Sequence, residues 1–442
     1  MDLINGKIKN LYFKYLLASL GSALITSIYS VVDMAVVGNY VGPNGTAALA
    51  IIAPIWNIIY SLGLLMGVGG SILFSSIRGR NIDVSNEDNK YFTSSFIGSI
   101  ILSLICWIVF YLFDKPILAF FGASDETLLS LCESYLLPIK IVLPTYLINQ
   151  MLIAFLRNDN DPTLATFAVL FGGIFNVIGD ILFTFTFNMG IFGAGLATAI
   201  GSVITTLLLC VHFFKKKNTL KLIKIDKLFI RLKNIIINGF SSFFIDVAMG
   251  ILTILFNRQI MRYLDSNALS IYGPIINIST FVQCCAYGVG QASQPIISTN
   301  YGANNGDRIK QTLKYALITT LIFSIFWTGI SLIYPEGFIY LFMTPTDEIL
   351  KIGPNMIRIY SLSFILLPLN IFSTYYFQSI MKPKVSFIIS VGRGLVISGI
   401  LIYLLPLISP DMIWFTMPIT EVIIAIYAIM QIVRCTKKLK TN

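Results

Sequence analysis

Four acidic residues lie inside long apolar segments of the sequence, where an ionised side chain is energetically unfavourable. Asp33, Asp180 and Asp246 lie well inside such segments, and Glu421 lies near the start of the last one. An ionised carboxylate at the middle of a membrane costs on the order of 2.5–3.5 kcal/mol, so intramembrane acids are functional by default. The simpler alternative, that each acid only pairs with amides and hydroxyls of a neighbouring helix, stays open, most of all for Asp246 and Glu421.

The residues around two of these acids suggest a cation site. Tyr29 lies four residues before Asp33, and Asn176 lies four residues before Asp180, so each pair shares one face of a helix. Carboxylate, amide and hydroxyl oxygens are the ligands that hard cations such as Na⁺ accept. The same carboxylates, removed from water, would instead hold a proton. The sequence therefore predicts an ion site without choosing between Na⁺ and H⁺.

The composition places most of the chain in a lipid environment. Hydrophobic residues make up 56% of the 442 residues and charged residues only 12%, and the mean hydropathy is +0.80. A soluble protein carries about 25% charged residues. The formal net charge of +10 comes from basic residues in short loops, so it predicts membrane orientation and not nucleic-acid binding.

The sequence also argues against an enzyme. It has a single histidine, His212, and its six cysteines form no CxxC pair, so neither a zinc site nor a catalytic triad is expected. No Walker lysine motif is present, which argues against ATP hydrolysis. We expect no cofactor beyond a coupling ion, and we expect no clustered nucleophile for an intramembrane enzyme. Channels usually have a repeated filter or charged rings, and none is evident.

Apolar segments recur along the whole chain and predict an all-α membrane protein. Each is long enough to cross about 30 Å of hydrocarbon as a helix. Twelve segments are expected: 13–37, 47–76, 92–113, 129–155, 163–185, 190–213, 236–262, 268–297, 312–334, 355–380, 385–406 and 412–434. With an even number of spans, most lysines and arginines fall on one side, which predicts a multi-pass protein of the cell membrane with both termini in the cytoplasm.

The sequence repeats itself with an offset of about 220 residues. Residues 48–58 resemble residues 268–278, and Gly67-Val68-Gly69 matches Gly288-Val289-Gly290. Repeats of six helices each have the same orientation in the membrane, an arrangement found in transporters. We therefore expect two parallel six-helix lobes, 1–214 and 235–442, joined by a basic cytoplasmic linker at 215–234. The glycine runs are expected to allow close helix packing.

Several pieces of sequence, taken in order, resemble the multidrug and toxic compound extrusion (MATE) family, of prokaryotic type. They are Asp33 followed by Val37-Gly38, Gly67-Val68-Gly69-Gly70-Ser71, Asn176-Val177-Ile178-Gly179-Asp180-Ile181-Leu182-Phe183 and Gly193-Ala194-Gly195-Leu196-Ala197-Thr198. The resemblance covers nearly the whole chain. It implies a cation-coupled antiporter, driven by H⁺ or Na⁺, that exports organic, cationic or amphipathic compounds by alternating access, and we expect it to act as a monomer.

The resemblance also implies which residues do this work. It assigns Asp33, Asn176, Asp180 and Thr198 to an ion site in the first lobe, and Asp246 is a candidate for coupling in the second. Candidates for the substrate cavity are Tyr29, Tyr60, Gln283, Tyr287, Tyr376 and Asn370.

The sequence departs from the family pattern in two main places. The tenth apolar segment reads Leu366-Leu367-Pro368-Leu369-Asn370 and lacks an acid found in some members, and the first segment lacks a proline found in some prokaryotic members. The main alternative is a flippase of related fold for lipid-linked oligosaccharides. Such a protein would have a larger basic cavity, whereas the intramembrane basic residues here are few: Arg393, Arg358 and Lys140.

Overall fold

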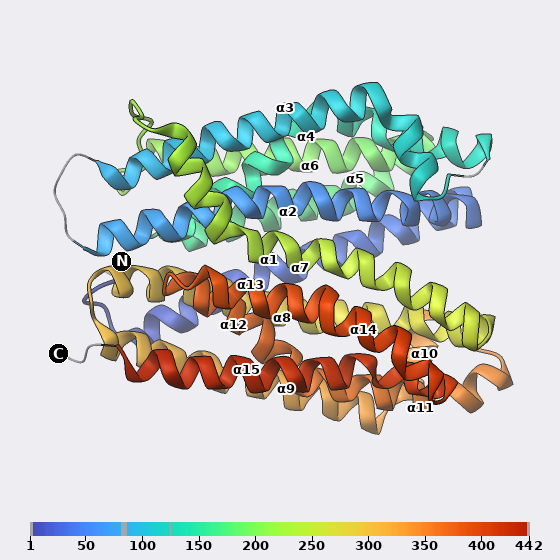
Figure 1. Ribbon diagram of the computed structural model, residues 1–442. Helices are drawn as coiled ribbons and strands as arrows, with labels where there is room; N and C mark the ends of the chain where they lie inside the picture. The colour runs from blue at the N-terminus through green and yellow to red at the C-terminus, as the bar shows by residue number, and fades with distance from the viewer. Residues whose placement is uncertain (1–2, 81–85, 124, 344, 440–442) are drawn as a thin grey trace. The chain divides into compact units, whose positions relative to one another are not determined.

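The computed structural model describes residues 3–80, 86–123, 125–343 and 345–439, and all regular elements within these ranges are helices (Figure 1). Twelve of its helical segments are long and apolar enough to cross a membrane. The prediction of twelve membrane helices is thereby confirmed. Each predicted segment lies within one observed span, except that two segments, 312–334 and 355–380, extend one residue past the end of theirs.

Seven of the twelve spans are single α-helices. They are α1 (Ile8–Val41), α2 (Pro43–Gly79), α3 (Glu87–Phe121), α4 (Glu126–Asn158), α7 (Leu228–Tyr263), α8 (Ser266–Gly302) and α9 (Gly306–Ile333).

The other five spans change helix type along their length. The fifth and sixth spans are α5 (Pro162–Ile181) with the π-helical turn η1 (Leu182–Thr186), and α6 (Gly190–Cys210) with the 3₁₀ turn η2 (Val211–Phe214). The tenth span is α11 (Asp347–Ser361), η3 (Leu362–Ile365) and α12 (Leu367–Ser379). The last two are α13 (Pro383–Val391), η4 (Gly392–Val396), α14 (Ile397–Leu404) and η5 (Leu405–Leu407), and then η6 (Pro410–Phe415) with α15 (Thr416–Lys437). A short helix, α10 (Pro335–Phe342), was not expected from the sequence.

The chain forms two compact units whose borders fall inside helices. Unit 1 holds mainly Leu17–Phe243, and unit 2 holds Ile4–Leu16 together with Phe244–Asn442. The first turns of α1 belong to unit 2 because the Tyr12 hydroxyl donates a 2.9 Å hydrogen bond to Thr319 of α9, and its ring stacks on Tyr315. The predicted lobes, 1–214 and 235–442 with a linker at 215–234, stay a prediction.

Glycines in α2 let three other helices approach it closely. A Cβ atom at Gly67 would lie 2.9 Å from the backbone of α4, at Gln150 and Met151. A Cβ atom at Gly69 would lie 2.8 Å from the backbone nitrogen of Gly239 in α7, and one at Gly70 would lie 3.0 Å from a side chain of α3 or α4. The glycine run is thus a packing device, as the sequence predicted, because small residues let helix backbones touch in a membrane.

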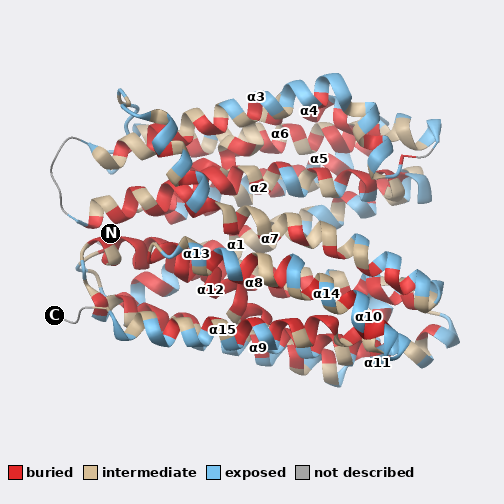
Figure 2. Cartoon of the chain, viewed as in Figure 1, coloured by how far each residue is buried: buried red, intermediate tan, exposed pale blue. Residues whose placement is uncertain are grey.

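The outer faces of the helices are apolar. In α3, Ile101, Leu104, Ile105 and Ile108 are all exposed and follow the three- and four-residue spacing of one helix face. A similar exposed stripe in α9 contains Ile318, Leu321, Ile322 and Ile325. Figure 2 shows such exposed outer turns along α3, in contrast to the largely buried turns of α2. Faces of this kind suit contact with lipid.

In two matching turns of the repeat, the helix ends with the same backbone conformation and the same hydrogen bond. Asn160 follows α4 with φ of 62°, and the next residue donates its N–H to the Leu156 carbonyl. Met381 follows α12 with φ of 55°, and the next residue donates its N–H to the Phe377 carbonyl. Each turn leads into a proline that starts the following helix. Asparagine tolerates this left-handed conformation better than methionine does.

A group of charged residues ties together one end of unit 1. His212 lies between two buried acids, with Nε2 2.8 Å from Asp159 and Nδ1 3.0 Å from Asp161. Arg78 at the end of α2 also bonds to Asp159 at 2.7 Å, and the chain after α6 joins through Thr219. Beyond that point the Lys221 N–H donates to the Asn89 side chain of α3 at 2.8 Å. The first part of the predicted linker is thus bound to unit 1.

Candidate ion and substrate site

Asp33 is joined to a tyrosine from another helix of unit 1. The Tyr135 hydroxyl of α4 donates a 2.5 Å hydrogen bond to Oδ2 of Asp33 in α1, and lies 3.4 Å from Oγ1 of Thr198 in α6. Asp33 is 8% exposed and Tyr135 2%. One phenol group therefore connects the acid of α1 with the hydroxyl of α6 in a buried setting.

The other predicted residues of the ion site lie in the same hydrogen-bonded group. Nδ2 of Asn176 in α5 donates to Thr198 at 3.0 Å and to Oδ1 of Asp180 at 3.4 Å. Asn176 and Asp180 are both buried. The structure thus brings together all four residues that the resemblance assigned to the ion site, and it adds Tyr135.

Three oxygens of this group have no hydrogen-bond donor within the described part of the chain. They are Oδ1 of Asp33, Oδ1 of Asn176 and Oδ2 of Asp180, and all three are buried. A buried polar atom without a partner costs about 1–3 kcal/mol, so such atoms call for an explanation. Two carboxylates, an amide oxygen and a hydroxyl form an oxygen set that can accept Na⁺, or the carboxylates can bind protons. We call Asp33, Tyr135, Asn176, Asp180 and Thr198 the Asp33 cluster.

Close packing of α5 on α6 holds one side of the Asp33 cluster. A Cβ atom at Gly172 would lie 2.7 Å from the Gly201 carbonyl, and one at Gly201 would lie 2.8 Å from the Gly172 carbonyl. Two turns further along α5, a Cβ atom at Gly179 would lie 2.9 Å from Ala197. Because α5 and α6 touch at these points, Asn176 and Thr198 are within hydrogen-bond reach.

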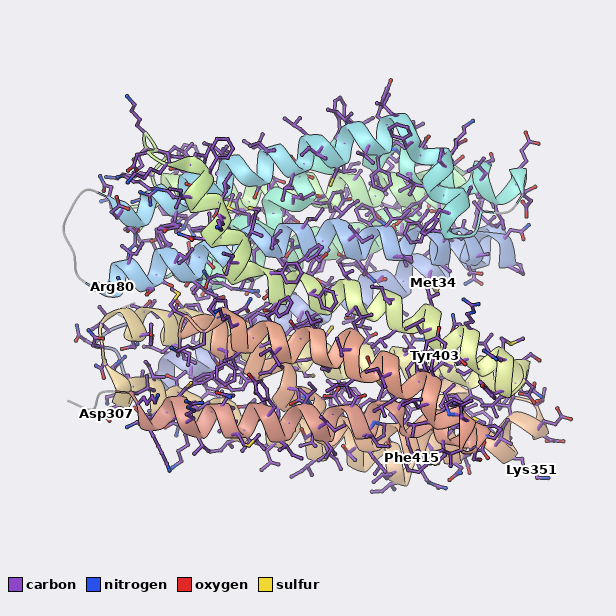
Figure 3. The ribbon with its side chains drawn as sticks, viewed as in Figure 1. Met34, Arg80, Asp307, Lys351, Tyr403 and Phe415 are labelled. Carbon is purple, nitrogen blue, oxygen red and sulfur yellow. The ribbon has the colours of Figure 1, made fainter. Side chains whose placement is uncertain are left out.

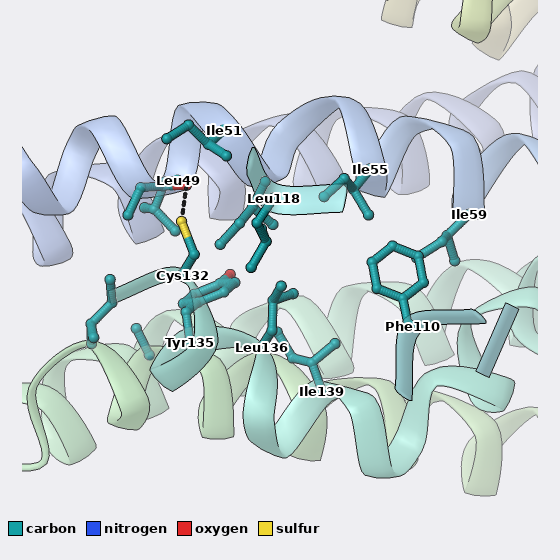
Figure 4. Close-up of a cluster of buried hydrophobic side chains, with 14 of the residues drawn as sticks. Leu49, Ile51, Ile55, Ile59, Phe110, Leu118, Cys132, Tyr135, Leu136 and Ile139 are labelled. Carbon is teal, nitrogen blue, oxygen red and sulfur yellow. Dashed lines mark hydrogen bonds between the residues drawn. The ribbon is translucent and has the colours of Figure 1, made fainter. Parts of the chain in front are cut away.

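A hydrophobic core holds the other side. The ring of Tyr135 belongs to a buried cluster with Leu49, Ile55 and Ile139 from α2 and α4, part of which is drawn in Figure 4. In unit 1, Met34 next to Asp33 lies at the opposite end from Arg80 (Figure 3). The Asp33 cluster is therefore displaced from the end where the charged residues around His212 lie.

The tyrosines predicted for the cavity in unit 1 lie at different depths. Tyr29 is partly buried against α5, where a Cβ atom at Gly173 would come within 3.3 Å of its ring. Tyr60 is partly buried in α2. The part of both tyrosines in substrate binding stays a prediction.

In unit 2, Asp246 of α7 has one partner. The Tyr287 hydroxyl of α8 donates a 2.8 Å hydrogen bond to Oδ1 of Asp246, while the buried Oδ2 has no donor within the described residues. Tyr287 also packs edge-to-face on Tyr375. This acid–phenol pair has the same chemistry as Asp33 with Tyr135.

A complete ion pair lies in the same unit. Nε of Arg393 in η4 is 2.6 Å from Oε1 of Glu421 in α15, and Nδ2 of Asn370 in α12 donates to Oε2 of Glu421 at 2.6 Å. Asn370 and Glu421 are fully buried. Although the stretch Leu366–Asn370 of the tenth membrane span has no acid, a carboxylate from the last span reaches Asn370.

A small pocket borders this ion pair. Its wall includes Arg393 and Gln283 and the rings of Phe256, Tyr272 and Tyr360. Oε1 of Gln283 is buried without a donor among the described residues. Gln283, predicted for the substrate cavity, is thus at a pocket, whereas Tyr376 is fully buried between Phe372 and Phe377 and reaches Thr436.

Sequence reasoning missed two of these relationships. Tyr135 lies 102 residues from Asp33, and no local pattern marks it. The pairing of Arg393 with Glu421 was not predicted, although an arginine and a glutamate in neighbouring apolar segments are a signal for it. Within the described residues, no group of three or more histidines, cysteines and acids could hold a metal.

Twelve membrane helices with buried, partly unpaired carboxylates define a polytopic membrane protein of the transporter type. The sequence pattern of the MatE family matches residues 18–182 and 241–404, so the chain belongs to this family. MatE proteins are transporters and not enzymes. The family expected from the residues is therefore confirmed.

Among curated relatives, the multidrug export protein MepA of Staphylococcus saprophyticus is 24% identical over 416 residues, covering 92% of this chain and 90% of the relative. MepA of Staphylococcus aureus is 25% identical over 414 residues, covering 92% of this chain and 89% of the relative. Both relatives thus align along nearly their whole length.

Solved structures agree on the fold. A MATE protein in a bent conformation has a TM-score of 0.89 at 20% identity, with 99% of this chain and 97% of the other covered. A MOP superfamily transporter from Pyrococcus furiosus also has a TM-score of 0.89 at 20% identity, covering 100% and 98%. At this identity the likeness extends to the fold alone.

Proposed function

We propose that this chain is a cation-coupled antiporter that exports organic, cationic or amphipathic compounds across the cell membrane by alternating access. The observation that carries the proposal is the Asp33 cluster, where three buried oxygens from α1 and α5 lack donors in the part of the chain that the structure describes. The names of the MepA relatives, multidrug export proteins, support the substrate class. The proposal includes a monomer with both termini in the cytoplasm, in line with the basic loops.

The coupling ion, Na⁺ or H⁺, binds at Asp33 and Asp180 in this proposal. With the ion bound, the cluster carries less negative charge and holds an organic cation less well, so the drug leaves toward the outside. After the change to the inward-facing state the ion leaves, and the negative cluster attracts a new cation. Coupling of this kind requires that ion and drug lower each other's affinity. Aromatic side chains such as Tyr29 supply cation–π contacts to flat cations.

The experiment is transport by purified protein in proteoliposomes. Efflux of a fluorescent organic cation is followed with a Na⁺ gradient and with a pH gradient, each imposed alone, for wild type and for Asp33→Asn. We expect one gradient to drive efflux in wild type and the same gradient to be ineffective in the variant. Asp246→Asn, the same substitution in unit 2, tests whether a second acid takes part.

Two results would overturn the proposal. Full, ion-dependent efflux by Asp33→Asn would show that the coupling ion does not bind at the Asp33 cluster. No efflux of any tested cation under either gradient, by protein that is folded, would instead favour the lipid-linked oligosaccharide flippase. Against that alternative, two of the three intramembrane basic residues have acidic partners, Lys140 with Asp114 and Arg393 with Glu421.

A further inference from the structure

The four acids that the sequence places inside apolar segments, Asp33, Asp180, Asp246 and Glu421, fall into two groups. Asp33, Asp180 and Asp246 each have one buried oxygen without a hydrogen-bond donor among the described residues. Glu421 has a partner at both oxygens, Arg393 at Oε1 and Asn370 at Oε2, each at 2.6 Å. Three acids are therefore free to accept a proton or a cation, and the fourth is already neutralised.

The fold holds the guanidinium of Arg393 in this place. Arg393 lies in the π-helical turn η4, and such turns interrupt an α-helix and are frequent at functional sites. The residues on either side are glycines: a Cβ atom at Gly392 would lie 3.0 Å from Ile424 of α15, and one at Gly394 would overlap Ala248 of α7. Because both neighbours are glycines, the turn fits between α7 and α15, next to Glu421.

Arg393 compensates the charge of the Glu421 carboxylate. Glu421 has no solvent exposure, and an unpaired buried charge is far costlier than a paired one. The amide of Asn370 lies beside the Glu421 carboxylate: its Nδ2 donates to Oε2 and to the backbone carbonyl of Glu421, and its Oδ1 has no donor among the described residues. With Arg393 removed, these oxygens are the ligand type that binds small cations.

We propose that Arg393 is a tethered counter-ion that fills a latent cation site formed by Glu421 and Asn370. Arg393 forms part of the wall of the pocket lined by Gln283, Tyr272 and Tyr360, so shortening this side chain would extend the pocket toward Glu421. In the intact protein, the guanidinium of Arg393 already pairs with Glu421, so no second cation is needed there.

This inference extends the proposed function, because it withdraws Glu421 from ion coupling and leaves the Asp33 cluster and Asp246 as the acids that can take part. It concerns unit 2 alone. Its test measures protein stability and needs no transport. The inference can therefore fail while the antiporter proposal holds, and the antiporter proposal can fail while the inference holds.

The test is chemical rescue of the full-length purified protein. The thermal unfolding midpoint is measured for wild type, Arg393→Ala, Arg393→Lys and the double variant Arg393→Ala/Glu421→Gln. Each is measured with methylguanidinium chloride and with the uncharged N-methylurea at equal concentration. Choline chloride keeps the ionic strength constant. The single and double alanine variants have the same Asp33 cluster, so any ion effect there cancels in their comparison.

We expect Arg393→Ala to lower the midpoint by about 5 °C or more, because it leaves Glu421 buried and unpaired. Methylguanidinium should recover about half of that loss at saturating concentration, and N-methylurea should recover none. The double variant and Arg393→Lys should lie near wild type and should not respond. If Arg393→Ala does not fold, folding of the double variant, or recovery of folded protein on purification in methylguanidinium, supports the same conclusion.

Three results would overturn the inference. One is an Arg393→Ala protein as stable as wild type. Another is a double variant damaged as badly as the single variant, which would assign the loss to packing and not to charge. The third is a midpoint that methylguanidinium and N-methylurea raise equally, or that methylguanidinium raises equally in the single and the double variant.

Discussion

Tyr135 donates a 2.5 Å hydrogen bond to Asp33, and this contact joins α4 to α1 at a point where both side chains are buried. The bond leaves the other carboxylate oxygen of Asp33 without a donor among the described residues. A phenol that fixes one oxygen of the acid also fixes the direction of the other. In the proposed mechanism, Tyr135 thus sets the geometry in which Asp33 meets its ion.

Tyr135→Phe is expected to weaken ion binding without abolishing transport. Loss of a hydrogen bond to a charged group costs about 1.5–3 kcal/mol, which corresponds to roughly a tenfold or larger change in affinity. The driving-ion concentration for half-maximal efflux should shift by about that factor. Tyr40→Phe is the control, since Tyr40 makes an equally short bond, to Asn188, but at an exposed position. An unchanged ion requirement in Tyr135→Phe would contradict this role.

Gly67→Ala is expected to destabilise unit 1. The added methyl group would lie 2.9 Å from the backbone of α4, so the two helices must move apart. Overpacking of this kind typically costs about 1–3 kcal/mol. The control is Gly250→Ala in α7, where the structure has nothing within 4 Å of the added carbon. Thermal unfolding should show a lower midpoint for the first variant and an unchanged or higher one for the second; equal effects would refute the packing argument.

Met381→Asn is expected to stabilise the protein. A non-glycine residue in the left-handed region costs about 1–2 kcal/mol, and asparagine is better tolerated there than methionine. A gain of about 0.5–1 kcal/mol in the free energy of unfolding is expected. The reverse exchange, Asn160→Met at the matching turn of the repeat, should reduce stability. If both variants shift the unfolding midpoint in the same direction, the left-handed conformation does not explain the change in stability.

The group around His212 predicts a loss of stability in acid. Burial alone would raise the pKa of Asp159, but hydrogen bonds from His212 and Thr219 outweigh it and hold the pKa below its usual range. An acid whose pKa is lower in the folded state contributes stability above its unfolded pKa, about 3.9, and this contribution is lost as the pH falls through the lower folded pKa.

The measurement is the unfolding midpoint between neutral pH and about pH 3. Asp159→Asn should be less stable than wild type at neutral pH and should converge with it as the pH falls. Asp411→Asn, a substitution at an exposed position, serves as control and should track wild type throughout. Parallel curves for wild type and Asp159→Asn would show that the charge of Asp159 has no part in stability.

The membrane helices and the family could be predicted from the sequence because they depend on local features. A helix that faces lipid must be apolar for about twenty residues, and the glycines that permit close packing are visible in the same segments. The four residues that the resemblance named for the ion site lie close together in the structure: Asn176 and Asp180 share a helix turn, and Asn176 bonds to Thr198. Their role in ion binding stays a prediction.

Long-range contacts explain what the sequence did not reveal. The first turns of α1 belong to unit 2 through contacts of Tyr12 with α9, more than 300 residues away in sequence. The role of Tyr135 depends on the crossing of α1 and α4, and a tyrosine in an apolar segment usually only packs. The turn that places Arg393 beside Glu421 is a local π-helix, which has no reliable composition signal.

The most direct test of the central claim is ion release on drug binding. Purified protein is loaded with Na⁺ or with protons, an organic cation is added, and the released ion is measured for wild type, Asp33→Asn/Asp180→Asn and Asp246→Asn. Reciprocity requires that a drug which competes with the ion at the Asp33 cluster expels it. We predict release of the coupling ion by wild type and none by the Asp33→Asn/Asp180→Asn variant. Unchanged release by that double variant, or its loss only in Asp246→Asn, would contradict the claim that the Asp33 cluster couples ion to drug.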